Sequence, residues 1–231
     1  MVFDDMELSD LAPIALLGGT FDPVHYGHLR LADDVRRALG LSELRLVPAA
    51  DPPHRGGPHA SAADRLAMLT AGIAEFPGLV VDDRELRRGG KSYTVLTLEE
   101  LRHAFPARPL WLILGADAFR GLPEWHRWRE LFTLAHIVVV ARPGVPPDAA
   151  LPPPLAEEWQ RRHTTLPAPL FATPAGRIFE QRVAPHPIAA TAIRVLLAQH
   201  RNMNQLPQLL PPGVLAYIEQ HQLYRPTKDA T

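Results

Sequence analysis

Two histidines three positions apart, His25 and His28, are the residues whose type and spacing most clearly suggest chemistry. They follow the apolar run 14–17 and the pair of Gly18 and Gly19, and they lead into a helical pattern of apolar residues. A strand, a tight glycine turn and a helix start are therefore expected in that order. The first turn of a helix offers free backbone amides and the positive end of the helix dipole. With two imidazoles beside it, this arrangement predicts a phosphate-binding site at the carboxyl end of a strand.

The rest of the chain alternates strand and helix patterns, and these elements must position the turn. We expect strands at 44–48, 79–81, 110–114 and 136–141, and helices at 60–76, 94–105 and 122–132. Continuous apolar strands between helices are typical of a parallel sheet that is covered on both faces. The predicted fold class is therefore α/β, a doubly wound Rossmann-like parallel sheet with helices on both faces and a small C-terminal helical part.

A chain of 231 residues fits one sizeable α/β domain, and we expect residues 1–231 to form it. Prolines interrupt the segment 143–187, which is predicted as a loop insertion with room for one strand at 177–183. Closing helices are expected at 191–200 and 213–220, so the C-terminal part covers about 191–221.

Composition excludes several classes of function. The formal net charge of -1 gives no sign of a nucleic-acid partner or of an acidic membrane surface. The absence of cysteine excludes disulfides, thiolate metal sites and cysteine nucleophiles. Residues 1–13 lack the pattern of a secretory signal, and no apolar run reaches the length of a membrane span. We expect a soluble, cytoplasmic protein.

The string G-G-T-F-D-P-V-H-Y-G-H-L at 18–29 resembles the HxGH signature of the nucleotidylyltransferase superfamily. Within that superfamily, it is similar to bacterial nicotinate-nucleotide adenylyltransferases. The resemblance implies transfer of an adenylyl group from ATP to nicotinate mononucleotide, which gives nicotinate adenine dinucleotide and pyrophosphate on the way to NAD. It also implies Mg²⁺ held through the ATP phosphates with no metal ligand from the protein. The implied partners are small-molecule substrates, without nucleic acid or membrane. The sequence leaves open whether the chain forms a homo-oligomer.

Further motifs extend the resemblance along the chain. Residues 188–194 are similar to the family's Ile-Ser-Ser-Thr-x-x-Arg motif, with alanines at 189 and 190 in place of the serines. The resemblance implies catalytic roles for His25, His28 and Arg194, and Thr191 is expected to open a helix. The residues implied to bind ATP are Gly19, Thr20, Phe21, His25, His28, Arg55, Gly115, Asp117, Thr191 and Arg194.

A second set of residues is implied to bind nicotinate mononucleotide: Ser92, Tyr93, Thr94, Trp125 and Arg142. Backbone N–H groups at the 92–94 turn can receive a carboxylate, which nicotinate carries and nicotinamide lacks. The indole of Trp125 is implied to stack on the pyridine ring, whereas Trp111 and Trp128 are expected to pack in the core.

Plainer interpretations stand beside these. A histidine pair can cap a helix or bind a metal, and Ser92 or Thr94 can be a helix N-cap. Scaffold roles are expected for Arg65, Met68, Tyr217, Ile218, Leu223 and Tyr224. The adenylyl acceptor could instead be nicotinamide mononucleotide or another phosphate compound. In a different class, the chain could be a nucleotide-binding regulator without turnover, which only Ala189 and Ala190 support.

Overall fold

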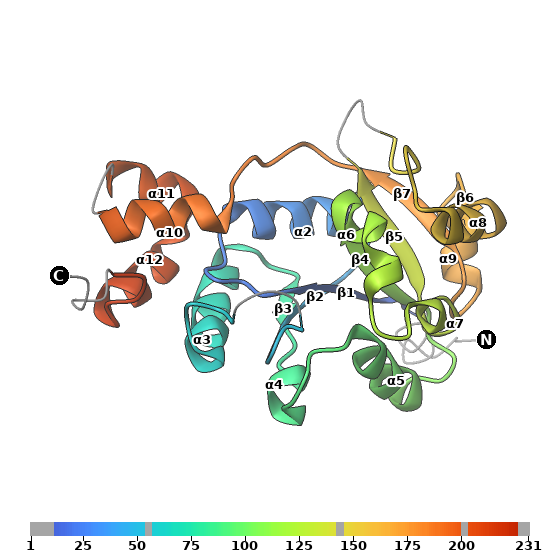
Figure 1. Cartoon of the computed structure of the whole chain (residues 1–231), viewed down its shortest axis with the longest axis horizontal. Helices are drawn as coiled ribbons and strands as arrows, with labels where there is room; N and C mark the ends of the chain where they lie inside the picture. Colours follow the sequence, from blue (N-terminus) through green and yellow to red (C-terminus); the bar gives the residue numbers. More distant parts are fainter. Residues whose placement is uncertain (1–11, 54–56, 142–145, 200–202, 226–231) are drawn as a thin grey trace, which may run out of the picture. The chain divides into compact units, whose positions relative to one another are not determined.

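The computed structural model describes residues 12–53, 57–141, 146–199 and 203–225 (Figure 1). The chain divides into two compact units. The first unit contains Met1–Gly18, Asp34–Arg45 and Tyr93–Pro185, and the second contains Gly19–Asp33, Leu46–Ser92 and His186–Thr231. The strands of a seven-stranded sheet follow the order β3-β2-β1-β4-β5-β7-β6. This order changes direction between β1 and β4, the kind of position where doubly wound sheets bind ligands.

Parallel strands form the centre of the first unit. They are β1 (Ile14–Gly19), β4 (Leu110–Gly115), β5 (His136–Ala141), β6 (His163–Thr164) and β7 (Ile178–Arg182). The ladders β1–β4, β4–β5, β5–β7 and β6–β7 are all parallel. Every residue of β5 is buried, as expected for a strand that is covered on both faces. The predictions of an α/β fold and of strands at 14–17, 110–114 and 136–141 are confirmed.

The helices of the first unit are α5 (Thr94–Ala104), α6 (Ala116–Arg120), α7 (Leu131–Leu134), α8 (Pro153–Arg162) and α9 (Ala168–Ala172). The prediction of one helix over 122–132 is wrong. Two 3-10 turns, Leu122–Glu124 and Trp128–Glu130, are separated there by an extended Trp125 and by Arg127 with a left-handed φ of 53°. Side-chain bonds from Arg127 to Glu99 and Glu130 hold this interruption in place.

The proline-rich segment 143–187 contains more regular structure than the expected loop insertion. Its described part holds α8, β6, α9 and β7 (Figure 1). Pro153 and Pro154 stand in the first turn of α8, where a missing N–H removes no helical hydrogen bond. Leu155 and Trp159 then lie one turn apart and are buried. The strand expected at 177–183 is confirmed as β7.

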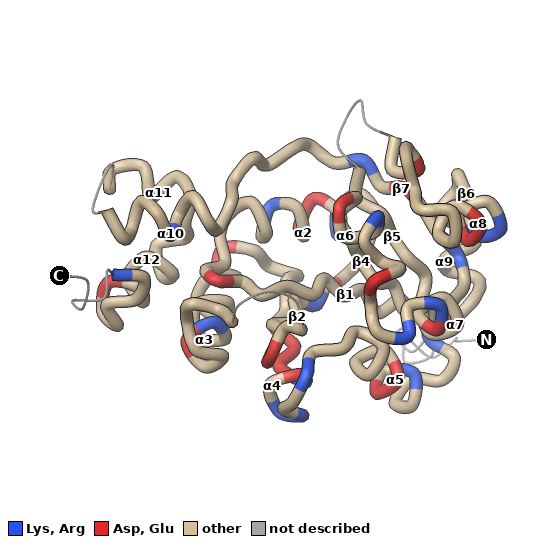
Figure 2. Tube along the Cα trace, in the orientation of Figure 1, with Lys and Arg blue, Asp and Glu red and all other residues tan. Residues whose placement is uncertain are grey.

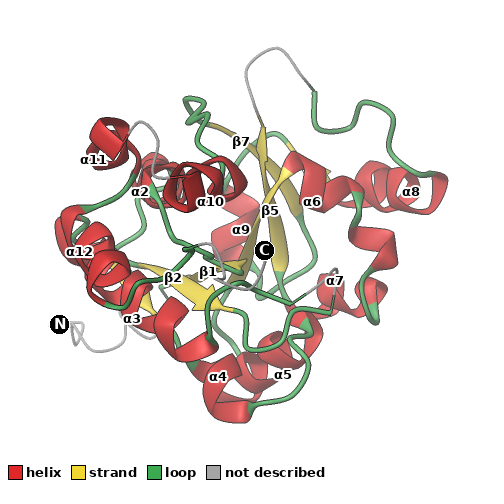
Figure 3. Cartoon of the chain, turned by 60° about the vertical axis from the view of Figure 1, so that its left-hand side comes forward, coloured by secondary structure: helices red, strands yellow, loops and turns green. Residues whose placement is uncertain are grey.

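The second unit contains the turn after β1 and several short elements. These are the start of α2 (Tyr26–Ala38), most of β2 (Leu44–Pro48), α3 (Ala62–Gly72), β3 (Leu79–Val81), α4 (Arg84–Arg88), α10 (Ala190–Gln199), α11 (Leu206–Leu209) and α12 (Pro212–Gln220). Helix α3 is shorter than the predicted 60–76, because Ser61 caps its start and a 3-10 turn, Ile73–Glu75, follows its end. The closing helices are confirmed as α10 and α12, and α12 packs on α3 (Figure 3).

Acidic and basic residues are interspersed along the trace in both units (Figure 2), in keeping with the formal net charge of -1. Among the residues that the structure describes, no helix is long and apolar enough to cross a membrane.

Candidate functional site

The turn between β1 and α2 is shaped by packing around Phe21. This residue has a left-handed φ of 51°, and its side chain is buried. A Cβ on Gly19 would lie 2.9–3.1 Å from three atoms of the Phe21 ring, so a larger residue does not fit there. The Phe21 ring meets the His28 ring edge-on, with centroids 5.2 Å apart. Gly19 and Phe21, both predicted as ATP-binding residues, thus fix the position of His28.

His25 and His28 lie together, and their rings stack with centroids 3.7 Å apart and planes 20° apart. The carbonyl of His25 accepts hydrogen bonds from the amides of His28 and Leu29 at 2.9 and 3.2 Å, so α2 starts directly after His25. A Cβ on Gly27 would come within 2.9 Å of His25 Nδ1 and 3.1 Å of the Ile188 Cβ. This crowding explains the glycine between the histidines.

Burial keeps both imidazoles neutral near neutral pH. It lowers the pKa of His25 to about 4, and burial together with the neighbouring His25 lowers the pKa of His28 to about 3. The Nδ1 atoms of both rings are buried and have no hydrogen-bond partner among the described residues. A neutral imidazole carries one N–H, and an acceptor placed at Nε2 selects the tautomer with its hydrogen there. The pair can therefore donate hydrogen bonds to an oxyanion.

A buried carboxylate, Asp22, connects this turn to distant segments. Its Oδ1 accepts from the amide of Ala60 at 3.1 Å and from the hydroxyl of Tyr224 at 2.7 Å. Its Oδ2 accepts from the amide of His59 at 2.8 Å, and His59 Nδ1 lies 3.3 Å away. Burial raises the pKa of Asp22, but these hydrogen bonds outweigh burial and the net pKa is lowered. Asp22 is therefore an ionised group whose charge is met by protein donors.

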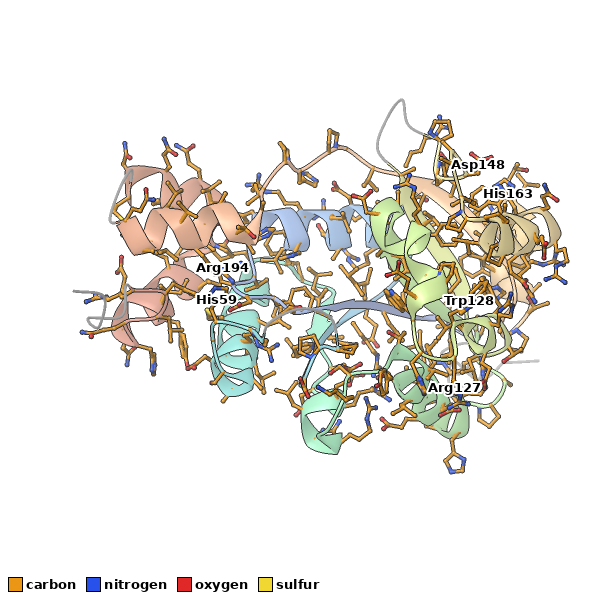
Figure 4. The ribbon with its side chains drawn as sticks, in the orientation of Figure 1. His59, Arg127, Trp128, Asp148, His163 and Arg194 are labelled. Atoms are coloured by element: carbon orange, nitrogen blue, oxygen red, sulfur yellow. The ribbon has the colours of Figure 1, made fainter. Side chains whose placement is uncertain are left out.

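Arg194 of α10 reaches the same turn. Its Nη1 donates to the backbone carbonyl of Asp22 at 2.6 Å, and its Nη2 donates to Thr191 Oγ1 at 3.3 Å. The same Nη1 lies 4.0 Å from Asp22 Oδ2. Figure 4 shows Arg194 and His59 close together. These bonds use two of the five N–H groups of the guanidinium, so Arg194 retains donors for a ligand.

The start of α10 differs from the prediction by one residue. The carbonyl of Ala189 accepts the Ile193 amide at 3.2 Å, and the helix begins at Ala190. Thr191 is thus the second residue of the helix and does not open it. The two alanines of the 188–194 motif leave the backbone amides of this first turn in place.

Arg65 and Ser92 hold backbone segments in the second unit. Arg65 is 1% exposed and donates to the carbonyls of Thr20 and Ala50 at 2.8 and 3.2 Å, in agreement with its expected scaffold role. Burial lowers its pKa. Ser92 Oγ accepts from the amides of Ala50 and Asp51 at 2.8 and 3.2 Å. The Ser92 hydroxyl is therefore bonded to the chain after β2 and does not cap a helix.

In the first unit, β4 ends at Gly115, which directly precedes α6. A Cβ on Gly115 would meet nothing within 4 Å. Asp117 lies in the first turn of α6, with its side chain 84% exposed and 3.1 Å from Arg120. The structure thus places these two residues, both predicted to bind ATP, at one strand end.

Three of the residues predicted to bind nicotinate mononucleotide, Tyr93, Thr94 and Trp125, also belong to the first unit. Thr94 is the first residue of α5 and Tyr93 precedes it. The Tyr93 ring packs on His126, with centroids 4.3 Å apart. Trp125, the neighbour of His126 in the chain, is partly exposed. Trp111 and Trp128 are buried, as predicted.

Arg55 and Arg142, both predicted as site residues, lie outside the described residues.

Other residues of the site carry little or no signal in the sequence. Asp22 stands in the G-G-T-F-D-P string, but nothing nearby indicates that His59 or Tyr224 reaches it. The scaffold role expected for Tyr224 includes a polar contact that its sequence position does not indicate, because its hydroxyl donates to Asp22. His126 has no signal beyond its position next to Trp125.

Comparisons with known proteins show which family the chain resembles. The family model described as cytidylyltransferase-like matches residues 16–196. A probable nicotinate-nucleotide adenylyltransferase of Aeromonas hydrophila subsp. hydrophila is 49% identical over 214 residues, which are 93% of this chain and 98% of the relative. Another, from Halorhodospira halophila, is 53% identical over 204 residues, or 88% and 91%. The structure of Plasmodium falciparum nicotinic acid mononucleotide adenylyltransferase complexed with NaAD has a TM-score of 0.67 at 16% identity, covering 92% of this chain and 97% of that one, which supports the fold.

The matched family and the strand–turn–helix site agree on the class of protein, a nucleotidylyltransferase with a cytidylyltransferase-like fold. The relatives that share about half of their residues with this chain over almost its whole length narrow the class to one family. The chain belongs to the nicotinate-nucleotide adenylyltransferase family.

Proposed function

We propose that the chain transfers an adenylyl group from ATP to nicotinate mononucleotide, giving nicotinate adenine dinucleotide and pyrophosphate in NAD biosynthesis. The observation that carries this proposal is the stacked His25–His28 pair at a helix start in a chain of this family. A phosphate oxygen of the mononucleotide attacks the α-phosphorus of ATP in line. One P–O bond forms there while the bond to the departing pyrophosphate oxygen breaks. Positioning and charge stabilisation are enough for such a step, without a covalent intermediate.

The ATP phosphates are assigned to the second unit. The imidazole N–H groups of His25 and His28, with the amides at the start of α2, are donors for phosphate oxygens whose negative charge grows in the transition state. Arg194 supplies positive charge for the β- and γ-phosphates. We assign the remaining ATP contacts, including those to ribose, to Gly19, Thr20, Phe21, Arg55, Gly115, Asp117 and Thr191.

Mg²⁺ is proposed to enter with ATP. The groups beside the histidine pair are N–H donors, and both oxygens of Asp22 already accept hydrogen bonds from the protein. Within the described ranges, no group of three or more His, Cys, Asp or Glu residues could hold a metal ion. The site therefore suits a triphosphate better than a bare cation. Mg²⁺ would neutralise phosphate charge as part of the substrate.

The acceptor is assigned to Ser92, Tyr93, Thr94, Trp125 and Arg142. The backbone amides at the start of α5 can bind the pyridine carboxylate, which the positive end of the helix dipole also favours. The partly exposed indole of Trp125 can stack on the pyridine ring. Nicotinamide mononucleotide lacks the carboxylate and would lose the first of these interactions.

Pyrophosphate release from ATP and Mg²⁺ tests the proposal, with nicotinate mononucleotide and nicotinamide mononucleotide as parallel acceptors. We expect turnover with the acid and much less with the amide. His28→Ala should lower kcat by about two to three orders of magnitude, as for loss of one oxyanion donor. His103→Ala is the matched control, because this exposed histidine lies at the other end of α5 from Thr94. ATP binding without pyrophosphate release with either acceptor would refute the proposal and favour a nucleotide-binding regulator.

A further inference from the structure

Tyr224 approaches the site from near the end of the described chain. After α12, the backbone takes left-handed φ angles of 54° at Gln222 and 60° at Tyr224. The Leu223 amide bonds to the Ile218 carbonyl at 3.1 Å and secures this turn. Left-handed backbone is unfavourable for a bulky residue, so it requires compensating contacts. The Tyr224 hydroxyl makes such a contact, a 2.7 Å hydrogen bond to Asp22 Oδ1.

The carboxylate that receives this bond has two sets of neighbours that compete for its charge. On one side are the neutral donors Tyr224, Ala60 and the His59 amide, at 2.7–3.1 Å. On the other side is the guanidinium of Arg194, whose Nη1 bonds to the Asp22 carbonyl and stays 4.0 Å from Oδ2. At 4.0 Å from Oδ2, the guanidinium stands at the outer limit of an ion pair, and the neutral donors keep the carboxylate from closing that distance.

We propose that Tyr224 is a positioning residue for adenylyl transfer, because its hydroxyl holds the Asp22 carboxylate and so leaves the charge of Arg194 available to the triphosphate. The inference rests on the proposed function. Without the hydroxyl, Oδ1 would keep only the Ala60 amide. Oδ2 would keep its contacts with His59, but the less tightly held carboxylate could rotate toward Arg194 and form a closer ion pair with it, at the expense of the phosphates. The same movement would disturb the turn that carries His25, which lies three residues further along the chain.

Tyr224→Phe tests this inference, because it removes one oxygen atom and keeps the ring. We expect kcat/KM for ATP to fall by about tenfold, a loss that corresponds to one hydrogen bond to a charged group. KM for nicotinate mononucleotide should stay unchanged. The matched control is Tyr217→Phe, since the Tyr217 hydroxyl also donates to a carboxylate, Asp64 Oδ1, at 3.0 Å. That bond joins α12 to α3, and Asp64 belongs to none of the assigned substrate contacts.

A readout independent of turnover separates this inference from the proposed function. Calorimetric titration with ATP should show weaker binding to Tyr224→Phe than to the wild type and to Tyr217→Phe. If the wild type does not release pyrophosphate, the proposed function fails, and the titration still tests whether Tyr224 controls the site. If Tyr224→Phe and Tyr217→Phe lose stability alike and neither changes ATP binding or kcat/KM, Tyr224 is only a packing residue and the inference is wrong.

Discussion

Lowering the pH from about 7.5 to about 5 should destabilise the folded chain through His25 and His28. Both imidazoles are neutral in the folded state, with pKa values of about 4 and about 3 against an ordinary value of 6.5. In the unfolded chain, the same rings take up protons as the pH falls through that ordinary value. Because the unfolded state then binds more protons, the stability contributed by the neutral pair is present above pH 6.5 and is lost on acidification.

The magnitude follows from the distance between the working pH and the ordinary pKa. At about pH 5, each unfolded imidazole lies about 1.5 units below its pKa, and one unit corresponds to about 1.36 kcal/mol. Each folded ring is still neutral at that pH, so each histidine costs about 2 kcal/mol and the pair about 4 kcal/mol. Typical domains have a stability of about 5–15 kcal/mol, so this loss is measurable.

Urea unfolding at a series of pH values checks the expectation. The wild type should lose about 4 kcal/mol over the interval, and His25→Asn or His28→Asn should each lose about 2 kcal/mol less than the wild type. The pKa of His136 is also lowered by burial, but this residue remains in all three proteins and its contribution cancels. An equal pH dependence in all three, or imidazole NMR titrations of His25 and His28 near the ordinary pKa, would refute the reasoning.

Other substitutions test the packing and the assignments. Gly27→Ala should lower the unfolding free energy by about 1–3 kcal/mol and remove most of the activity, because the new Cβ would meet the His25 ring at 2.9 Å. Gly18→Ala is the control and should leave the unfolding free energy in urea nearly unchanged, because its Cβ would meet nothing within 4 Å. Arg65→Met should lower the unfolding free energy by about 2–3 kcal/mol, since two part-buried carbonyls lose a charged donor. Trp125→Ala should raise KM for nicotinate mononucleotide about tenfold in steady-state kinetics and leave KM for ATP unchanged, or the stacking assignment is wrong.

Strands with continuous apolar runs could be predicted from the sequence with nearly correct bounds. The run at 136–141 is apolar after its first residue, and only a strand covered on both faces hides every side chain of such a run. The prediction of a helix at 122–132 is wrong because a long-range contact overrides the local pattern. Its apolar residues have a helical spacing, but Arg127 takes a left-handed conformation held by Glu99 and Glu130. The contact with Glu99 spans 28 residues, so no local pattern reveals it.

The same limit explains which part of the site the sequence indicates. His25 and His28 lie three positions apart at the start of α2, so their spacing alone brings them together. The contacts of Asp22 with His59, Arg194 and Tyr224 span 37, 172 and 202 residues. Only the folded second unit brings these residues together, and neither their types nor their spacing in the sequence indicates that all three contact Asp22.

The position of Asp22 in the turn proposed to bind phosphate poses an electrostatic problem, because a free carboxylate there would repel the triphosphate. The structure resolves it in two ways. Protein donors occupy both carboxylate oxygens, which lowers the pKa of Asp22 while directing its charge into the protein. Its backbone carbonyl, which bears no net charge, holds Arg194 at the turn. Since both histidines are neutral and Arg65 is buried, the partly exposed Arg194 supplies a positive charge beside this turn for an incoming phosphate. The proposed role of Tyr224 follows from this arrangement, because a residue that keeps Arg194 from closing on Asp22 at 4.0 Å would preserve the charge of Arg194 for the ligand.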